Sequence, residues 1–234
     1  MWEFIDKLVY INLDHREDRR QIMNKLFKDG NIPLEKVERF SAIRHPVGIV
    51  GCAMGHISIL KKAKENGWKN VLIMEDDMEW ASNFTENYET LKQLLQSSKW
   101  DVCMLAGLFI DYEYPRVKTA FCTNAYIVNA HYYDTLLDNF ETGLRNKLNV
   151  SVPYAPLRSK SNTEVLRNKL IDSRNQFNVD TYWFLLQERH MWLGLEMCKQ
   201  LNTYSDIYKS DVKHELATPD SMRPYVQYLK SQQI

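Results

Sequence analysis

The feature that most constrains the fold is a repeated alternation of short apolar runs with amphipathic stretches. Residues 7–13 are rich in β-branched and aromatic side chains, which predicts a buried strand, and a helical pattern follows them. The alternation continues with a helix over residues 51–65 and a compact apolar strand over residues 70–74. This order predicts an α/β fold in which helices cover both faces of a mostly parallel sheet.

Local signals place the ends of these elements. Asp14 is expected to cap the first helix, because Glu17 follows it three residues later as in a capping box. The later part of the chain predicts a helix over residues 84–96, strands over residues 101–105 and 125–128, a helix ending near Phe140, a helix near Arg189 and a strand over residues 191–195.

Residues 143–178 interrupt the alternation. The stretch 158–162 is polar and has no period, and two prolines precede it. One interpretation is a mobile loop near the site that serves as a lid over the ligand. The other is a solvated excursion with a short helix near residues 164–170.

Charge and length limit the class of partner. The chain has 234 residues, with 30 Lys and Arg against 30 Asp and Glu, so its formal net charge is +0. This balance excludes a nucleic-acid binder that relies on a broad cationic surface. No apolar run is long enough for a transmembrane segment, and the acidic first residues do not resemble a signal peptide. We expect one domain over residues 1–234, soluble and cytoplasmic or excised from a larger protein, in an oligomeric state that the sequence leaves open.

Three consecutive acids follow the strand over residues 70–74. Glu75, Asp76 and Asp77 would repel one another unless a cation or hydrogen-bond donors offset their charge. Alternate residues of an extended chain point to one side, so Glu75 and Asp77 are expected to face one site and Asp76 to point away. Mg²⁺ or Mn²⁺ bridging carboxylates to a phosphate is one interpretation. A solvated, acid-rich turn is the other.

Five groups of motifs, in order along the chain, resemble glycosyltransferase family 25, which includes bacterial lipooligosaccharide galactosyltransferases and collagen hydroxylysine galactosyltransferases. The motifs lie at residues 10–20, 51–56, 71–77 and 123–128 and, for the final segments, at residues 179–180 and 205–207. One departure is Gly55, which stands where the family has a serine before its histidine, here His56. We interpret His56 itself as a structural residue rather than a catalytic one.

The resemblance implies a GT-A fold, a Rossmann-like α/β/α sandwich that binds a nucleotide-sugar with a divalent metal, Mn²⁺ or Mg²⁺. By analogy Asp77 is the first choice as metal ligand, with Glu75 on the metal or on the ribose. The cofactor-binding residues that we predict are Asn12, Leu13, Arg16, Glu75 and Asp76. For Arg16 the alternative to a phosphate contact is an exposed position in the first turn of the helix, with ion pairs to Glu17 or to the acidic neighbours of Arg20.

Two further roles follow from the resemblance. Asp180 is the candidate base for an inverting reaction, with the adjacent Tyr182 and Trp183 as faces on which a sugar lies; the alternative is that Asp180 is a helix N-cap. His214 is the candidate that completes the metal shell, in competition with Asp211, and a surface position for either is the alternative.

The function that the resemblance implies is transfer of a hexose from a UDP-sugar to a hydroxyl acceptor. Galactose is the first choice of hexose and glucose the second. Glycan, lipid-linked and protein hydroxylysine acceptors are all compatible with the sequence. The alternative is a catalytically weak nucleotide-sugar-binding domain of a larger glycan- or collagen-modifying protein.

Overall fold

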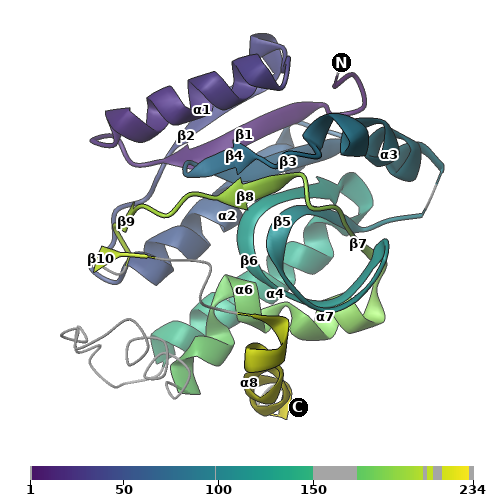
Figure 1. The fold of residues 1–234 in the computed structure, drawn as a ribbon. Coiled ribbons are helices and arrows are strands. Elements are labelled where there is room, and N and C mark those ends of the chain that lie inside the picture. Colours follow the sequence, from purple (N-terminus) through teal and green to yellow (C-terminus); the bar gives the residue numbers. More distant parts are fainter. Residues whose placement is uncertain (1, 98, 150–172, 208–209, 213–217, 232–234) are drawn as a thin grey trace.

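A mixed β-sheet with helices on both faces forms the body of the protein (Figure 1). The computed structural model describes residues 2–97, 99–149, 173–207, 210–212 and 218–231. Within these residues the main sheet has six strands in the order β2-β1-β3-β6-β5-β7. Their bounds are β1 Lys7–Asn12, β2 Val37–Ser41, β3 Asn70–Glu75, β5 Val102–Glu113, β6 Arg116–Asn129 and β7 Trp192–Gly194.

The sheet is mostly parallel. Strand β1 runs parallel to β2 and β3, and β5 runs parallel to β7, whereas β6 lies antiparallel to its neighbours β3 and β5. Among the strands of this sheet, β6 alone therefore points the other way. The α/β fold class predicted from the alternation of strands and helices is confirmed.

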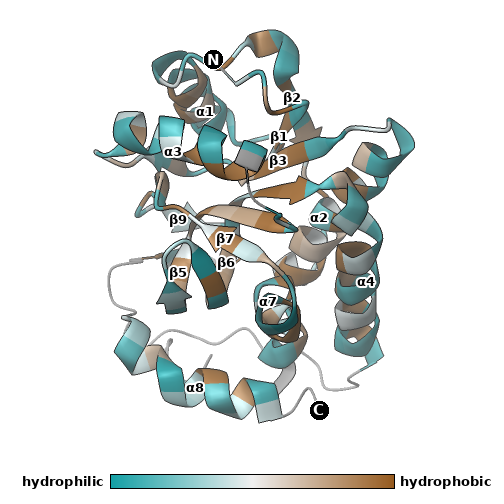
Figure 2. Cartoon of the chain, turned by 90° about the vertical axis from the view of Figure 1, so that its right-hand side faces the viewer, coloured by the Kyte–Doolittle hydropathy of each residue, from teal (hydrophilic) through white to brown (hydrophobic). Residues whose placement is uncertain are grey.

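Two helix pairs cover the two faces of the sheet. Helices α1 (Glu17–Asp29) and α3 (Phe84–Ser97) lie on one face, and α2 (Gly48–Glu65) and α4 (Tyr133–Asn149) lie on the other (Figure 1). The central strands β1 and β3 are largely apolar and buried, and they are mostly brown in Figure 2. This arrangement is the α/β/α sandwich expected from the sequence.

Side chains of β3 show how one strand supplies both cores. Val71 and Ile73 pack with α2 and α4, whereas Leu72 and Met74 pack with α1 and α3, and all four are fully buried. Successive side chains of a strand point to opposite faces, so a strand buried on both faces is apolar at every position. The run ends at Glu75, where the strand leaves the core.

Two further pairs of short strands lie outside the main sheet. Strand β4 (Met78–Trp80) pairs with β8 (Cys198–Gln200), and β9 (Tyr204–Ser205) pairs with β10 (Ser210–Asp211), both antiparallel. The remaining helical segments are η1 Leu34–Lys36, η2 Ala130–Tyr132, η3 Ser173–Phe177, α6 Val179–Tyr182, α7 Phe184–Arg189 and α8 Pro219–Ser231. No helix of the described residues is long and apolar enough to span a membrane.

Several local predictions differ from the structure. Helix α1 starts at Glu17 with Arg16 as its N-cap, because the Asp14 carboxylate accepts hydrogen bonds from Arg39 and Ser41 instead. Helix α4 continues to Asn149 rather than ending near Phe140, since its later residues pack on the core and on Tyr182.

The interruption predicted at residues 143–178 is therefore partly helical. Residues 143–149 belong to α4, and η3 begins at Ser173. Residues 150–172 lie outside the described residues, and with them the polar stretch 158–162 and the short helix predicted near residues 164–170. The lid interpretation stays a prediction.

Candidate active site

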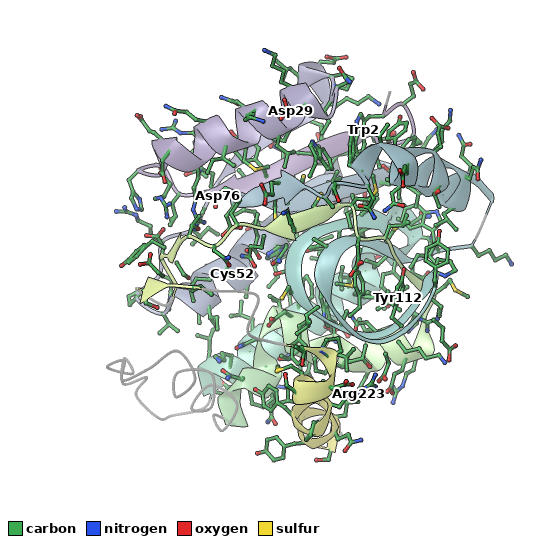
Figure 3. All side chains as sticks on the ribbon, viewed as in Figure 1. Trp2, Asp29, Cys52, Asp76, Tyr112 and Arg223 are labelled. Carbon is green, nitrogen blue, oxygen red and sulfur yellow. The ribbon has the colours of Figure 1, made fainter. Side chains whose placement is uncertain are left out.

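A cleft of about 1400 Å³ lies at the carboxyl ends of β1 and β3. Leu13 follows the end of β1, and the three acids Glu75, Asp76 and Asp77 lie at the end of β3. Helix α2 forms one wall, and the segment that includes β8 and β9 forms another. Figure 3 labels Cys52 and Asp76, which line this cleft from α2 and from the end of β3. In sheets of this kind, ligands bind outside the carboxyl ends of the parallel strands.

Two of the three consecutive acids are buried. Asp76 and Asp77 are each 6% exposed. Asp76 accepts hydrogen bonds from Asn12 Nδ2 and from an Arg19 guanidinium nitrogen, both at 2.6 Å. Asp77 lies 3.2 Å from the same guanidinium nitrogen and accepts a 3.2 Å hydrogen bond from Gln200 Nε2. The interpretation of the triplet as a solvated turn is therefore wrong.

Glu75 has a different environment. Its Oε1 accepts a 3.1 Å hydrogen bond from Thr123 and lies 4.0 Å from Nε2 of His56. Within the described residues no lysine or arginine forms an ion pair with it. Burial, followed by the charge of Asp77, raises the pKa of Glu75 to about 8. Glu75 is thus the acid of the triplet that lacks a cationic partner.

Arg19 is a site residue that the sequence reasoning missed. Its guanidinium joins Asp76 and Asp77 through one nitrogen, while the other donates 2.8 Å hydrogen bonds to Thr203 Oγ1 and to the Tyr204 carbonyl oxygen. A signal for it exists, because positions 19, 23, 26 and 27 form the buried face of α1. An arginine among the apolar residues of a helix face needs a buried partner.

The three cofactor-binding residues predicted at the end of β1, namely Asn12, Leu13 and Arg16, differ in their contacts. Asn12 is buried and also accepts a 2.9 Å hydrogen bond from Arg39, whereas Leu13 lines the cleft. Arg16 pairs with Asp18 at 2.7 Å and with Asp206 at 2.6 Å, and it does not line the cleft. Arg16 thus forms ion pairs, one with an acid of its own helix and one with Asp206, and its contact with a phosphate stays a prediction. Among the described residues, Arg19 and Arg44 are the arginines that line the cleft.

Asp180 lines the cleft from α6. It is the second residue of this helix, and the N-cap is Asn178, so the interpretation of Asp180 as a helix cap is wrong. Its charge acts on Glu75 and raises the pKa of that residue further. Its role as a base stays a prediction.

The aromatic residues after Asp180 do not form the sugar platform that we expected. Trp183 is fully buried and donates a 3.0 Å hydrogen bond to the Ala120 carbonyl oxygen. Tyr182 packs beside Gly143 and Phe177. Neither aromatic ring lines the cleft.

The structure describes one of the two candidates for the third metal ligand. His214 lies outside the described residues. Asp211 is exposed, belongs to β10 and does not line the cleft. Both assignments therefore stay predictions.

A second group of potential ligands lies beside Glu75. His56 is fully buried, and its Nδ1 is 2.8 Å from the Tyr126 hydroxyl. Burial lowers the pKa of His56 to about 3, so the ring is neutral. Cys52 lies four residues earlier on α2, and the ligand atoms of Cys52, His56 and Glu75 are all within 4.8 Å of one another. We expected His56 to be a structural residue, and the structure places it among the residues that line the cleft.

Backbone irregularities in β5 and β6 also border the cleft. The pairing of β5 with β6 shifts register around Ala106 and Leu108, and Gly107 and Cys122 from this region line the cleft. Cys122 has a φ of 74°, which is unusual for a residue with a side chain. A Cβ atom at Gly107 would lie 2.8 Å from the Phe121 carbonyl oxygen. Strained backbone of this kind gathers at functional sites.

The fold and the cleft define an α/β protein with an acidic site at a strand end, and comparison with known proteins shows which family part of the chain resembles. Residues 46–120 match the model of glycosyltransferase family 25, described as an LPS biosynthesis protein. The resemblance found in the motifs is thereby confirmed over a segment that holds α2, β3 and the acid triplet.

The similarity to individual proteins covers part of the chain or has low sequence identity. The chain is 32% identical over 125 residues to the putative glycosyltransferase R655 of Acanthamoeba polyphaga mimivirus, a match that covers 45% of this chain and 38% of that protein. Two solved structures are similar in outline. A197 from STIV has 11% identity and a TM-score of 0.43, covering 83% of this chain and 84% of that one. A glycosyltransferase involved in the glycosylation of the major capsid of PBCV-1 has 8% identity and a TM-score of 0.45, covering 96% and 98%.

Proposed function

We propose that the protein is a glycosyltransferase that moves a hexose from a UDP-sugar to a hydroxyl acceptor. The observation that carries the proposal is the charge of the acid triplet in the cleft. Arg19 is the guanidinium that pairs with Asp76 and Asp77, so the triplet in its fully ionised form carries two negative charges more than this one cation offsets. That excess matches one divalent ion. The triplet lies in the segment that matches family 25.

The donor set suits a hard divalent ion. Glu75 and Asp77 offer carboxylate oxygens to the cleft, and oxygen is the ligand that Mn²⁺ and Mg²⁺ prefer. Burial, followed by the charge of Asp77, raises the pKa of Glu75, and a bound ion would offset the same charge that a proton now offsets. When bound, the ion supplies electrostatic stabilisation of the departing diphosphate. His214 remains our candidate for a third ligand.

The chain's own residues would prepare the site around that ion. Arg19 fixes Asp76 and Asp77, and Asn12 holds the second oxygen of Asp76. Because Arg19 lines the cleft and Arg16 does not, we assign the first contact with the nucleotide diphosphate to Arg19. Leu13 would then pack against the nucleotide at the end of β1.

The acceptor would be activated from the other side of the cleft. We assign Asp180 as the group that accepts the proton of the acceptor hydroxyl while its oxygen attacks the anomeric carbon. Such an attack inverts the configuration of the sugar. Galactose is the first choice of hexose and glucose the second, and the acceptor is a glycan, a lipid-linked glycan or a protein hydroxyl such as hydroxylysine. Residues 1–234 would act as one glycosyltransferase domain.

A second candidate is a catalytically weak nucleotide-sugar-binding domain of a larger glycan- or collagen-modifying protein. It is favoured by the fact that the match covers only 38% of the mimivirus relative. Gly55 bears less on this choice than the motif suggested. A Cβ atom at Gly55 would lie 3.7–3.8 Å from Ile11 and Phe40. The side chain of a serine at this position would therefore start toward the sheet rather than toward the acids.

Release of UDP from a panel of UDP-sugars in the presence of Mn²⁺ tests the proposal. Asp77→Ala should lower the rate by about 100-fold or more, because it removes a ligand that stabilises transition-state charge. Asp134→Ala is the matched control, since this carboxylate pairs with Lys64 on the surface. Release equal to that of Asp77→Ala for every donor would refute the proposal. UDP binding without turnover on any acceptor would favour the second candidate.

A further inference from the structure

We propose that Cys52, His56 and Glu75 form a binding site for Zn²⁺ on the wall of the cleft. This site is distinct in donor chemistry from the oxygen-lined site of the acid triplet. It joins one sulfur, one imidazole nitrogen and one carboxylate oxygen, a combination that suits zinc better than Mg²⁺ or Mn²⁺.

The fold brings the three ligands together from two elements. Cys52 and His56 are four residues apart on α2, so their side chains leave the same face of the helix. Glu75 ends the neighbouring strand β3 and supplies the third ligand atom. All three ligand atoms lie within 4.8 Å of one another, and all three residues line the cleft. An ion among them would need only small movements of the side chains.

The strongest sign of a missing partner is on His56. The side chain is fully buried, yet no group in the described part of the chain forms a hydrogen bond with its Nε2. This atom faces Glu75, whose Oε1 is 4.0 Å away, a distance too long for a hydrogen bond and wide enough for an ion between the two. A buried polar atom without a partner is costly unless something binds it.

The surroundings resemble those of metal-binding histidines in general. The other ring nitrogen, Nδ1, is held by the Tyr126 hydroxyl at 2.8 Å, and such an outer contact fixes the orientation of a ligating ring. Thr123 donates a hydrogen bond to Glu75 and so orients that carboxylate as well. Three protein ligands leave the fourth position of a tetrahedral ion open toward the cleft.

The two sites share Glu75, and this has a functional consequence that rests on the proposed function. An ion held by Cys52 and His56 would withdraw Glu75 from the Mn²⁺ site beside Asp77. Zinc should therefore inhibit Mn²⁺-dependent UDP release, whereas its binding can be measured without any activity.

Co²⁺ and Zn²⁺ titrations of the full chain, purified free of metal, test the site. Co²⁺ should give a sulfur-to-cobalt charge-transfer band, and Zn²⁺ should displace it. Cys52→Ala should abolish the band and weaken Zn²⁺ binding by about 100-fold or more, and Cys52→Ser should do the same while preserving side-chain shape. Cys122→Ala, which removes another thiol from the same cleft, should keep both signals. Tyr126→Phe should weaken Zn²⁺ binding by about 10- to 100-fold.

The outcomes separate this proposal from the proposed function. Absence of the band in the unmodified protein, or wild-type Zn²⁺ affinity in both folded Cys52 variants, would overturn the zinc site. Asp77→Asn should retain Zn²⁺ binding, because Asp77 is not a ligand of this site. If Asp77→Asn also retained full UDP release, the proposed function would fail while the zinc site stood. Relief of zinc inhibition in Cys52→Ser, relative to its own rate without zinc, would support both.

Discussion

Replacement of Arg19 by methionine would test whether this buried guanidinium holds the acid triplet together. Methionine keeps most of the apolar stem and removes the charge that pairs with Asp76 at 2.6 Å and with Asp77 at 3.2 Å. Removing one partner of a buried ion pair costs about 3–5 kcal/mol, because the other charge stays buried without compensation. We therefore expect the free energy of unfolding to fall by about that amount at pH 7. Urea denaturation measures it.

The pH dependence of this loss gives a second, sharper test. Burial raises the pKa of both Asp76 and Asp77, whereas Arg19 opposes that rise, so the variant should raise both values further. An acid whose pKa is raised by folding destabilises the folded state at pH values where it must be charged. The loss in Arg19→Met should therefore be largest at neutral pH and shrink as the pH falls and the carboxylates become protonated.

Arg20→Met is the matched control for this experiment. Arg20 is the next residue of α1, and it pairs with Glu17 at the surface, where the Glu17 side chain is 79% exposed. Surface pairs of this kind contribute at most about 1 kcal/mol. If Arg19→Met lost no more stability than Arg20→Met, or if its loss grew at acid pH, the reasoning would be refuted.

The remaining predictions concern single residues of the cleft and its support. The raised pKa of Glu75 makes its charged form unfavourable in the folded state, so the free energy of unfolding should decline as the pH rises from 4.5 to about 8. Glu75→Gln should flatten this decline. Urea denaturation across the range measures it, and a profile unchanged by the substitution would contradict the raised pKa of Glu75. Asp180→Asn should lower turnover by about 100- to 10,000-fold and leave UDP binding unchanged, and a parallel loss of UDP binding in calorimetry would argue against a role as base. Trp183→Ala should cost about 3–5 kcal/mol in thermal unfolding. If a smaller replacement, Trp183→Phe, weakened sugar-donor binding in a folded protein, our correction of the sugar platform would be wrong.

Much of the fold could be predicted because its signals are local. The apolar run before Glu75 predicts β3 closely, and the alternation of elements predicts the layered sheet. The Asp14 cap failed because a distant partner decided its contacts: Arg39 comes from β2, which pairs with β1. The strands predicted at residues 101–105 and 125–128 proved to be the buried ends of a long hairpin, β5 and β6.

The candidate site could be predicted only in part for a related reason. Consecutive acids after a strand are visible in the sequence, but the partners that hold them are not. Arg19 and Gln200 come from α1 and β8, and Gln200 reaches Asp77 across 123 positions of sequence. Trp183 misled us because an aromatic residue beside a candidate base looks the same in sequence whether its ring faces a ligand or the core.

The large sequence separation between the acids and their partners bears on the order in which the parts of the cleft form during synthesis. A chain is synthesised from its N-terminus, and early segments begin to fold before later ones emerge. The acids after β3 and their arginine on α1 are then in place more than a hundred residues before Gln200 and Thr203 join them. During synthesis the acidic side chains of the cleft thus exist before the wall that holds them, and the cleft is complete only after β8 has been made.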